Sequence, residues 1–370
     1  MAIPGFATDA GTQRYRARHA TCHPDHFRSL RDLWVSSIGL GTYLGDPDDR
    51  TDALYAEAIA AALDAGCNLL DTASNYRFQR SERVIGATLE RLVGDGAIAR
   101  DEVVLCTKGG YIPFDSEMPA DPGRYIIETL FRPGLIQYDD VVANSHVLTP
   151  RYLEHQLAVS LRNLRVETVD IYYLHNPEQQ LDEIPREKFL ARIEAAFSLL
   201  ERKVQEGAIR LYGTATWNGY RGNPQDRGHL SLEELTGIAR RAGGDGHHFR
   251  VIQAPLNLAM PEIYAFKNQS VNGQAMSLLD AAAALGLSVV ASASLLQSQL
   301  VKLPGAMAHL IPNLRTDAQR AIQFVRSTPG VTTALVGTKH AAHVTENASV
   351  AAVPPLAPEH IAELFTPIRS

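Results

Sequence analysis

The fold can be read outward from three apolar runs that each end in an ionisable side chain: NLLD at 68–71, VVLCTK at 103–108 and DIYYLH at 170–175. If these runs are β-strands, they carry Asp71, Lys108 and His175 to the same edge of one sheet. Parallel α/β barrels place their chemistry at that edge, because strand C-termini and the loops after them converge there. TASNY at 72–76 follows the first run and adds Tyr76, five residues after the carboxylate.

Strand-like and helix-like segments alternate along the rest of the chain, which is the pattern of βα units in a parallel sheet. We expect eight strands, at 37–42, 68–71, 103–108, 170–175, 208–213, 251–254, 287–291 and 332–336. Helices are expected at 51–65 (ended by Gly66), at 81–92, from 149, at 189–204, from 231, at 277–285 and at 317–327. This order predicts an α/β fold with a closed (β/α)8 TIM barrel. An open doubly wound sheet is the alternative, although GLGTYL at 39–44 lacks the last glycine of its dinucleotide fingerprint.

Residues 1–35 are polar and aperiodic and are expected to form an N-terminal extension with a hairpin, whereas 36–370 are expected to form a single barrel domain. Arg14, Arg16 and Arg18 alternate and are expected on the solvent-facing side of that hairpin. The connection after the third strand, 109–148, is far longer than a usual βα loop. We expect it over the active site as a lid or pocket wall; a decoration with its own small helix is the alternative.

The composition narrows the class of protein. The chain has 370 residues, of which 45% are apolar and 21% charged, so a large core is possible. No run approaches the roughly 18 apolar residues of a membrane span, and MAIPGF at the start is not a signal peptide, so we expect a cytoplasmic protein with no membrane segment. A formal charge of −6 without a long basic run argues against nucleic-acid binding. Cys22, Cys67 and Cys106 have no paired spacing and are expected to be reduced, the last two as buried apolar residues.

A cluster of potential metal ligands lies in HATCHPDH at 19–26. The spacing matches no standard zinc pattern, so we expect a solvated loop and no metal, with a metal site as the less favoured interpretation.

Several of these motifs, in this order, resemble the aldo-keto reductase family. DTASNY at 71–76 resembles its strand-two signature, CTK at 106–108 its strand-three lysine and VDIYYLH at 169–175 its strand-four histidine. GTY at 41–43 fits the end of its first strand, and GTK at 337–339 with EN at 346–347 resembles its C-terminal dinucleotide segment. The resemblance spans roughly 37–347 and implies NAD(P)H-dependent reduction of an aldehyde or ketone.

The resemblance assigns catalytic roles to Asp71, Tyr76, Lys108 and His175. Hydride addition to a carbonyl builds an alkoxide, so a proton must arrive as charge develops. Tyr76 is the expected general acid, and the Lys108 cation is expected to bring its pKa from the ordinary value of about 10 closer to neutral pH. Asp71 would hold the ammonium, and His175 would orient and polarise the carbonyl oxygen.

The resemblance also implies a set of cofactor contacts: Gly41, Thr42, Thr216, Gln253, Ser292, Leu295, Gly337, Thr338, Lys339, His343, Glu346 and Asn347. Thr216 stands in Ala215-Thr216, where the family has a Ser-Asn pair for the nicotinamide carboxamide. Ser292 stands where a nicotinamide-stacking aromatic is common, and Trp217 is a candidate replacement.

The choice between NADP and NAD depends on the position four before Asn347, where the family's Arg pairs with the 2′-phosphate of NADP. That position is His343, and a neutral imidazole holds phosphate less well than a guanidinium does. Lys339 and the N-terminus of the same helix can still favour phosphate, so NADP(H) is expected, with NAD as the alternative.

The sequence therefore predicts an NADP-dependent carbonyl reductase or alcohol dehydrogenase that acts on a small-molecule carbonyl compound. The aromatic residues of 109–148 favour a substrate larger than a simple aldehyde, such as a sugar or a polycyclic ketone. The altered nicotinamide contacts keep a second hypothesis open, a cofactor-binding regulatory or accessory subunit on the same fold. A third is an isomerase or lyase that uses the Tyr-Lys pair without net redox.

Overall fold

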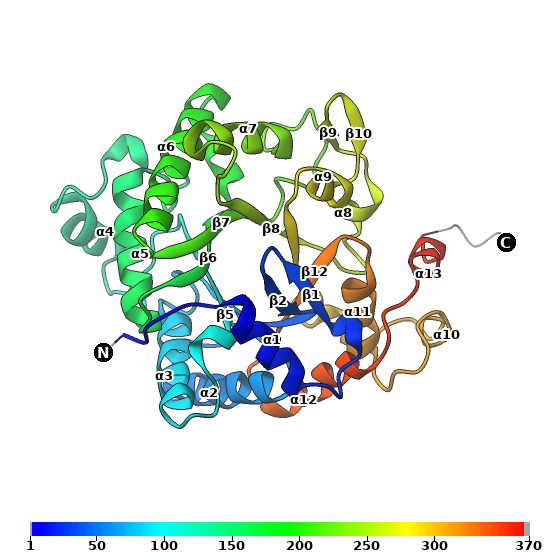
Figure 1. Cartoon of the computed structure of the whole chain (residues 1–370). Helices are drawn as coiled ribbons and strands as arrows, with labels where there is room; N and C mark the ends of the chain where they lie inside the picture. Colours follow the sequence, from blue (N-terminus) through cyan, green and yellow to red (C-terminus); the bar gives the residue numbers. More distant parts are fainter. Residues whose placement is uncertain (1, 366–370) are drawn as a thin grey trace.

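The computed structural model describes residues 2–365, in which eight parallel strands close into a barrel (Figure 1). The barrel strands are β3 (Ile38–Gly41), β4 (Leu69–Asp71), β5 (Val104–Gly109), β6 (Val169–His175), β7 (Ile209–Ala215), β8 (Phe249–Pro255), β11 (Ser288–Ser292) and β12 (Val331–Gly337). β12 pairs with β3, with Gly337 opposite Gly41, so the sheet has no free edge. The predicted TIM barrel is confirmed, and the open sheet is wrong.

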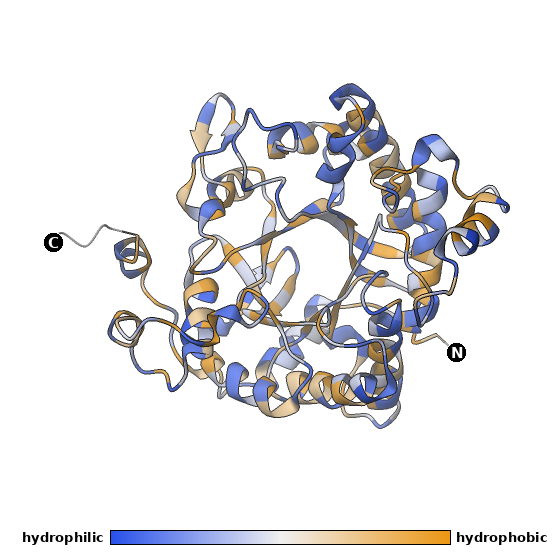
Figure 2. Cartoon of the chain, turned by 180° about the vertical axis from the view of Figure 1, so that it is seen from behind, coloured by the Kyte–Doolittle hydropathy of each residue, from blue (hydrophilic) through white to orange (hydrophobic). Residues whose placement is uncertain are grey.

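Helices surround the barrel and join consecutive strands, except α12, which follows the last strand. They are α2 (Asp49–Asp64), α3 (Arg80–Gly94), α5 (Pro150–Leu164), α6 (Arg186–Gln205), α7 (Leu232–Gly243), α9 (Leu278–Ala284), α11 (Asp317–Ser327) and α12 (Ala341–Ala348). Shorter elements are α8 (Glu262–Ala265), the β9 (Gln269–Val271) and β10 (Gln274–Met276) hairpin, α10 (Met307–Leu310) and α13 (Pro358–Glu363). The outer helices carry both hydrophobic and hydrophilic residues (Figure 2), as expected for helices with one face on a sheet and one in solvent.

Local signals in the sequence explain where these helices begin and end. In α2, the Asp48 side chain accepts a hydrogen bond from the backbone N–H of Thr51, which caps the helix. The chain then reverses at Gly66, whose φ of +88° suits a residue without a Cβ atom. The glycine that the sequence identified as a helix stop therefore works as one.

The N-terminal residues close the bottom of the barrel. A hairpin of β1 (Phe27–Leu30) and β2 (Leu33–Ser36) inserts Leu30, Leu33 and Val35 among the inward-facing residues of the barrel strands. The prediction that Arg14, Arg16 and Arg18 lie on a hairpin is wrong, because they belong to the helix α1 (Asp9–Arg18). The buried Glu102 carboxylate accepts hydrogen bonds from Arg14 and Arg18, and this pairing fixes α1 against the barrel.

The long segment after β5 lies mainly beside α5 on the outside of the barrel (Figure 1). It contains α4 (Pro122–Ile126) and one π-helical turn (Ile127–Phe131). It builds a small hydrophobic core of its own from Ile112, Leu130, Ile136 and Val147. Tyr111, at its beginning, lines the cavity at the C-terminal end of the barrel that is described below. The segment thus gives one residue to the pocket wall, and most of it has the character of a separate decoration.

The HATCHPDH segment forms no metal cluster, since no described group of three or more His, Cys, Asp or Glu side chains is placed to hold an ion. His26 is instead buried between the Ser37 hydroxyl and the carbonyl of Gly66.

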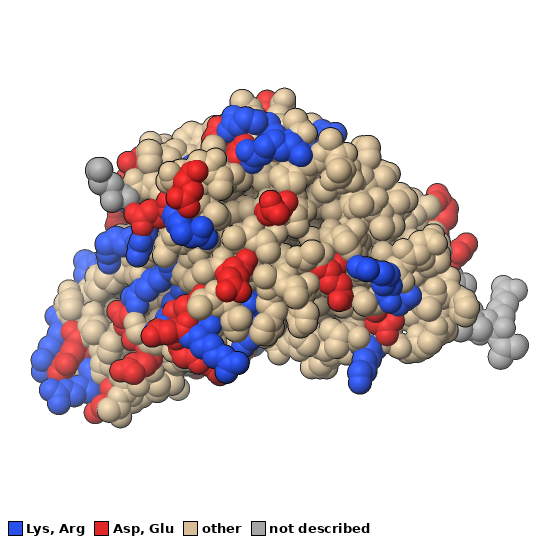
Figure 3. Space-filling view, turned by 90° about the horizontal axis from the view of Figure 1, so that it is seen from below, with Lys and Arg blue, Asp and Glu red and all other residues tan. Residues whose placement is uncertain are grey.

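Cys67 and Cys106 are buried and unpaired, as predicted. Lys and Arg side chains are mixed with Asp and Glu over the face in Figure 3. Within 2–365, no helix has the length and hydropathy needed to cross a membrane.

Gly86 makes α3 sensitive to a single methyl group. A Cβ atom at Gly86 would lie 2.4 Å from the carbonyl oxygen of Asn163 and 2.6 Å from the carbonyl carbon of Leu164, both in α5. We expect Gly86→Ala to destabilise the protein by about 1–3 kcal/mol through overpacking, despite the higher helix propensity of alanine. Gly94→Ala, at the exposed end of α3 with no atom within 4 Å of the added Cβ, is the matched control and should be neutral or stabilising. Urea unfolding measures both, and equal effects would contradict the packing argument.

Candidate active site

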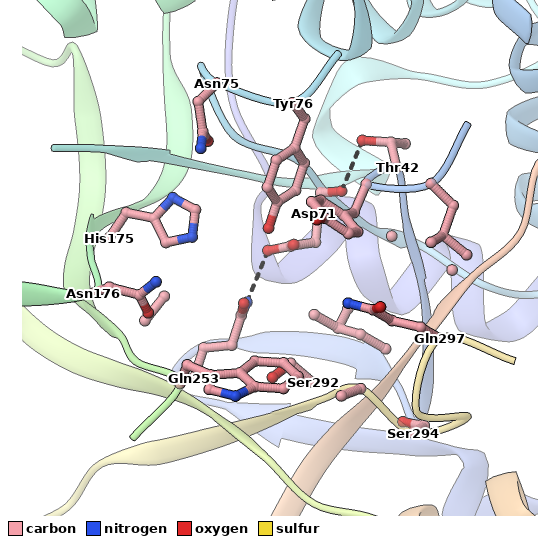
Figure 4. A pocket seen from close by; sticks show the side chains of 18 of the residues that line it. Thr42, Asp71, Asn75, Tyr76, His175, Asn176, Gln253, Ser292, Ser294 and Gln297 are labelled. Atoms are coloured by element: carbon pink, nitrogen blue, oxygen red, sulfur yellow. Dashed lines mark hydrogen bonds between the residues drawn. The ribbon is translucent and has the colours of Figure 1, made fainter. Parts of the chain in front are cut away.

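A cavity of about 400 Å³ opens at the C-terminal ends of the barrel strands. This volume is within the usual range of small-molecule sites, roughly 300–1,000 Å³. Among the predicted residues, the following line it: Gly41, Thr42, Asp71, Tyr76, His175, Thr216, Gln253, Ser292, Leu295 and Gly337. Figure 4 shows the side chains of Asp71, Tyr76 and His175 pointing toward one another across this cavity.

The fourth predicted catalytic residue, Lys108, is buried directly behind the cavity wall, with 1% of its surface exposed. Its Nζ lies 2.5 Å from Oδ2 of Asp71, 2.8 Å from the carbonyl oxygen of Thr72 and 3.4 Å from the hydroxyl of Tyr76. The structure therefore brings together the phenol, ammonium and carboxylate that the strand ends predicted. One carboxylate oxygen, one carbonyl oxygen and one hydroxyl accept hydrogen bonds from the three N–H groups of the ammonium.

Burial controls the proton affinities of these groups. It raises the pKa of Tyr76 above its ordinary value, and the Lys108 cation offsets only part of this increase. Lys108 lowers the pKa of Tyr76, as expected, but burial outweighs it, so the expectation of a net pKa closer to neutral pH is wrong and the phenol keeps its proton at neutral pH. Burial alone would lower the pKa of Lys108, but the Asp71 carboxylate and Tyr76 outweigh it, so the ammonium stays charged. Burial, followed by the charge of Lys108, lowers the pKa of His175 well below its usual range, so the imidazole is neutral.

His175 is held from its backbone side and by an aromatic ring. Its carbonyl oxygen lies 2.7 Å from Nε2 of His146, whose Nδ1 lies 2.8 Å from the amide nitrogen of Gln180. The Gln180 amide can only donate, so His146 carries its proton on Nε2 and donates it to His175. The Tyr111 ring stands edge-on to His175, with 5.0 Å between ring centroids. The two ends of the 109–148 segment thus support this histidine.

The turn after Tyr76 has an unusual backbone. Arg77, Phe78 and Gln79 have φ values of 49°, 54° and 70°, a left-handed conformation that costs non-glycine residues about 1–2 kcal/mol each. Contacts on both sides compensate for this strain. Arg77 donates to the carbonyl oxygen of Asp46 and pairs with Asp52.

On the other side of this turn, the long segment supplies the restraints. The backbone N–H of Ser116 donates to the carbonyl of Phe78 at 2.9 Å, and the Gln79 amide donates to the carbonyl of Phe114 at 3.0 Å. The 109–148 segment therefore helps to shape the loop that carries the phenol, although most of it lies outside the cavity.

Two predicted nicotinamide contacts are already engaged inside the protein. The amide nitrogen of Gln253 donates to Oδ1 of Asp71 at 2.8 Å (Figure 4), which leaves the amide oxygen of Gln253 as its free group. The hydroxyl of Thr216 donates to the buried Glu178 carboxylate and accepts from the N–H of Gly219. Thr216 lines the cavity, but its only hydroxyl proton is donated to Glu178 and is not free for a bound cofactor.

The remaining predicted cofactor residues lie just before α12 or within it and do not line the cavity: Thr338, Lys339, His343, Glu346 and Asn347. Lys339 lies close to Gly45, where a Cβ atom would be 3.3 Å from its Nζ. Glu346 accepts a hydrogen bond from the Thr316 hydroxyl at the N-cap of α11, and Asn347 is buried. His343 packs its ring against His340.

Sequence reasoning missed several residues that line the cavity: Tyr43, Asn75, Tyr111, Asn176, Ser294, Gln297 and Ser298. Asn75 and Asn176 are direct neighbours of Tyr76 and His175, so a polar residue beside a predicted catalytic one was the available signal. The Ser294 hydroxyl is buried without a hydrogen-bond partner among the described residues. Such an unsatisfied polar atom in a cavity wall indicates a place for a bound group.

Comparison with known proteins agrees with this geometry. The profile of the Aldo/keto reductase family matches residues 37–220. The chain is 28% identical over 200 residues to a 6-dehydroglucose reductase of Novosphingobium aromaticivorans, covering 52% of each chain. It is 28% identical over 189 residues to an NADH-specific methylglyoxal reductase of Escherichia coli, covering 50% of this chain and 49% of that one. The match spans about half the length of these curated relatives.

The fold similarity extends further than the sequence similarity. The structure of an aldo/keto reductase from Klebsiella pneumoniae, in complex with NADP and acetate, superposes with a TM-score of 0.61. The sequence identity is 22%, and the alignment covers 92% of this chain and 94% of that one. Together with the ordered strand-end motifs, these similarities show that the chain belongs to the aldo/keto reductase family.

Proposed function

We propose that the protein is an NADP(H)-dependent oxidoreductase that reduces an aldehyde or ketone to an alcohol, with Tyr76 as the proton donor. The observation that carries this proposal is the 3.4 Å separation between the buried Lys108 ammonium and the hydroxyl of Tyr76, which lines one cavity together with His175. The 6-dehydroglucose reductase and the NADP-bound Klebsiella pneumoniae protein support it by similarity.

A nicotinamide cofactor held in this cavity would supply the hydride. Tyr76 donates its proton to the carbonyl oxygen as negative charge develops there. Lys108 then stabilises the tyrosinate that remains, and Asp71 keeps the ammonium in place. The neutral imidazole of His175 donates a hydrogen bond that orients the carbonyl oxygen toward Tyr76. Because the pKa of Tyr76 is raised, the donor is fully protonated at neutral pH, and reduction should decline only at high pH.

The cavity fits the nicotinamide half of such a cofactor. Gly41 and Gly337 are paired across β3 and β12 and bring no side chain into the cavity, and the space beside Gly41 is open, since an added Cβ atom would meet nothing closer than 3.9 Å. The free amide oxygen of Gln253 and the unpartnered hydroxyl of Ser294 offer polar contacts. Lys339, at the start of α12, would hold the phosphate end.

A second candidate, a cofactor-binding accessory subunit, is favoured by one observation. The Thr216 hydroxyl is committed to Glu178, so one polar contact expected for the carboxamide is absent. Tight NADPH binding without turnover of any aldehyde or keto-sugar would favour this candidate, and loss of NADPH absorbance in a substrate panel would favour the enzyme.

Tyr76→Phe removes the transferable proton and little else. We expect carbonyl reduction to fall by about 10²–10⁴-fold while NADPH binding stays unchanged, since positioned proton transfer contributes a factor of this size. Steady-state reduction of the best aldehyde from the panel and NADPH fluorescence titration measure the two quantities. Near-normal reduction by the variant would show that another group supplies the proton.

Lys108→Met leaves the buried Asp71 without its cation. Breaking such a pair typically costs about 3–5 kcal/mol, so urea unfolding should show a loss of this size. The double variant Lys108→Met with Asp71→Asn removes both charges and should recover part of the loss. Additive losses in the double variant would mean that the two side chains do not stabilise each other.

Cofactor preference tests the role of Lys339. NADPH should bind more tightly than NADH by roughly tenfold, the effect of one charge-assisted phosphate contact. Lys339→Met should remove most of that difference and leave NADH binding unchanged. Fluorescence titration with both cofactors decides this, and equal or tighter NADH binding by the unmodified protein would overturn the preference for NADP(H).

A further inference from the structure

A second cavity, of about 660 Å³, adjoins the first on the far side of Tyr111 and Trp217. Tyr111, Asn176 and Trp217 line both cavities, so the two cavities meet at these three side chains. We call this second cavity the acidic annex. Its walls come from the loops after β6 and β7 and from α8.

The charge of the acidic annex is unbalanced. Four carboxylates line it, those of Glu178, Asp182, Asp226 and Glu262. Among the described residues that line it, Arg221 is the one Lys or Arg, and its guanidinium is already bonded to both oxygens of Glu262, at 3.2 and 2.7 Å. Several carboxylates around one open cavity attract cations, although solvent weakens the effect of the exposed Asp182 and Asp226.

The histidine of this wall does not correct the imbalance. His229 is buried and lies 2.9 Å from the carbonyl oxygen of Asn268. Burial lowers its pKa, so it is neutral at physiological pH.

Glu178 provides an independent sign of a missing partner. Only 7% of this residue is exposed. Its Oε1 accepts from the Thr216 hydroxyl and from the backbone N–H groups of Trp217 and Asn218. Its Oε2 is buried and has no hydrogen-bond partner among the described residues. A buried carboxylate oxygen without a donor is costly, so this wall of the annex favours a ligand that donates hydrogen bonds.

Trp217 adds an aromatic surface at the junction of the two cavities, where 39% of the residue is exposed. Cations bind well over the face of an indole ring. An aromatic face beside carboxylates is the combination that suits an alkylammonium group.

We propose that the acidic annex binds an alkylammonium group of the carbonyl substrate, so that the preferred substrates are amino-aldehydes or amino-ketones. This inference rests on the proposed function for the carbonyl end, but the annex itself can be tested without turnover. The alkylammonium group of the substrate lies beyond Tyr111 and Trp217, in the annex, while its carbonyl group lies beside Tyr76. Neutral analogues of the same shape lose the contact with the carboxylates.

The first experiment measures binding without cofactor. The chain has two tryptophans, so in Trp34→Phe the fluorescence reports Trp217 alone. Titration with benzyldimethylammonium should give a saturable change, and the added variants Asp182→Asn and Asp226→Asn should weaken it by about tenfold, as expected for lost ionic contacts in a partly enclosed site. Asp245→Asn, on an exposed loop, is the matched control and should not weaken it. An equal response to benzyl alcohol, or unchanged affinity in the acidic-annex variants, would overturn the proposal.

The second experiment compares two aldehydes of nearly equal shape, 4-(dimethylaminomethyl)benzaldehyde and 4-isobutylbenzaldehyde. We expect kcat/KM to favour the amine by about tenfold, and the ratio to fall toward one in Asp182→Asn with Asp226→Asn. The ratio is taken within each variant, so partial misfolding does not affect it. Reduction of both aldehydes at equal efficiency would refute the annex while leaving the proposed function intact. Ammonium binding without reduction of either aldehyde would refute the proposed function and leave the annex as a cation site.

Discussion

A buried ammonium is the constraint on which the active end of this barrel depends. Lys108 is almost completely removed from water, and an unpaired charge in such a place would cost several kcal/mol. Its three donors are satisfied by Asp71, by the carbonyl of Thr72 and by Tyr76, all contributed by β4 and the loop after it. These partners meet only if β4 and β5 lie side by side in the observed register, with Asp71 opposite Cys106. Pairing of β4 with β5 and assembly of the contacts around Lys108 are therefore one structural event.

The sequence predicts this part of the molecule well because strand ends carry two signals at once. An apolar run marks a buried strand, and the ionisable residue that ends it marks the edge where loops converge. The predicted runs ending at Asp71 and Lys108 correspond to β4 and β5, and their side chains are in contact as expected. The prediction needed no knowledge of distant packing, since neighbouring strands of a βα barrel follow one another in sequence.

Features that depend on contacts between distant residues could not be predicted in this way. Arg14 and its neighbours alternate in sequence as in a strand, but the buried Glu102, far along the chain, is paired with them on a helix. The hydrogen bond that occupies the Thr216 hydroxyl depends on Glu178, 38 residues earlier in the chain, and no local pattern links the two residues. The rise in the pKa of Tyr76 likewise follows from how deeply the fold buries it, a quantity that local sequence does not contain.

The left-handed turn at Arg77, Phe78 and Gln79 extends the influence of the site well beyond the residues that a ligand touches. Its backbone shape is imposed from outside, by Asp46 and Asp52 on one side and by the peripheral segment at 114–116 on the other. Substitutions at these supporting positions can therefore change the reactivity of the Tyr76 hydroxyl while every residue that lines the cavity stays the same. We therefore expect the sequence of the 109–148 segment and the reactivity of Tyr76 to change together among related proteins.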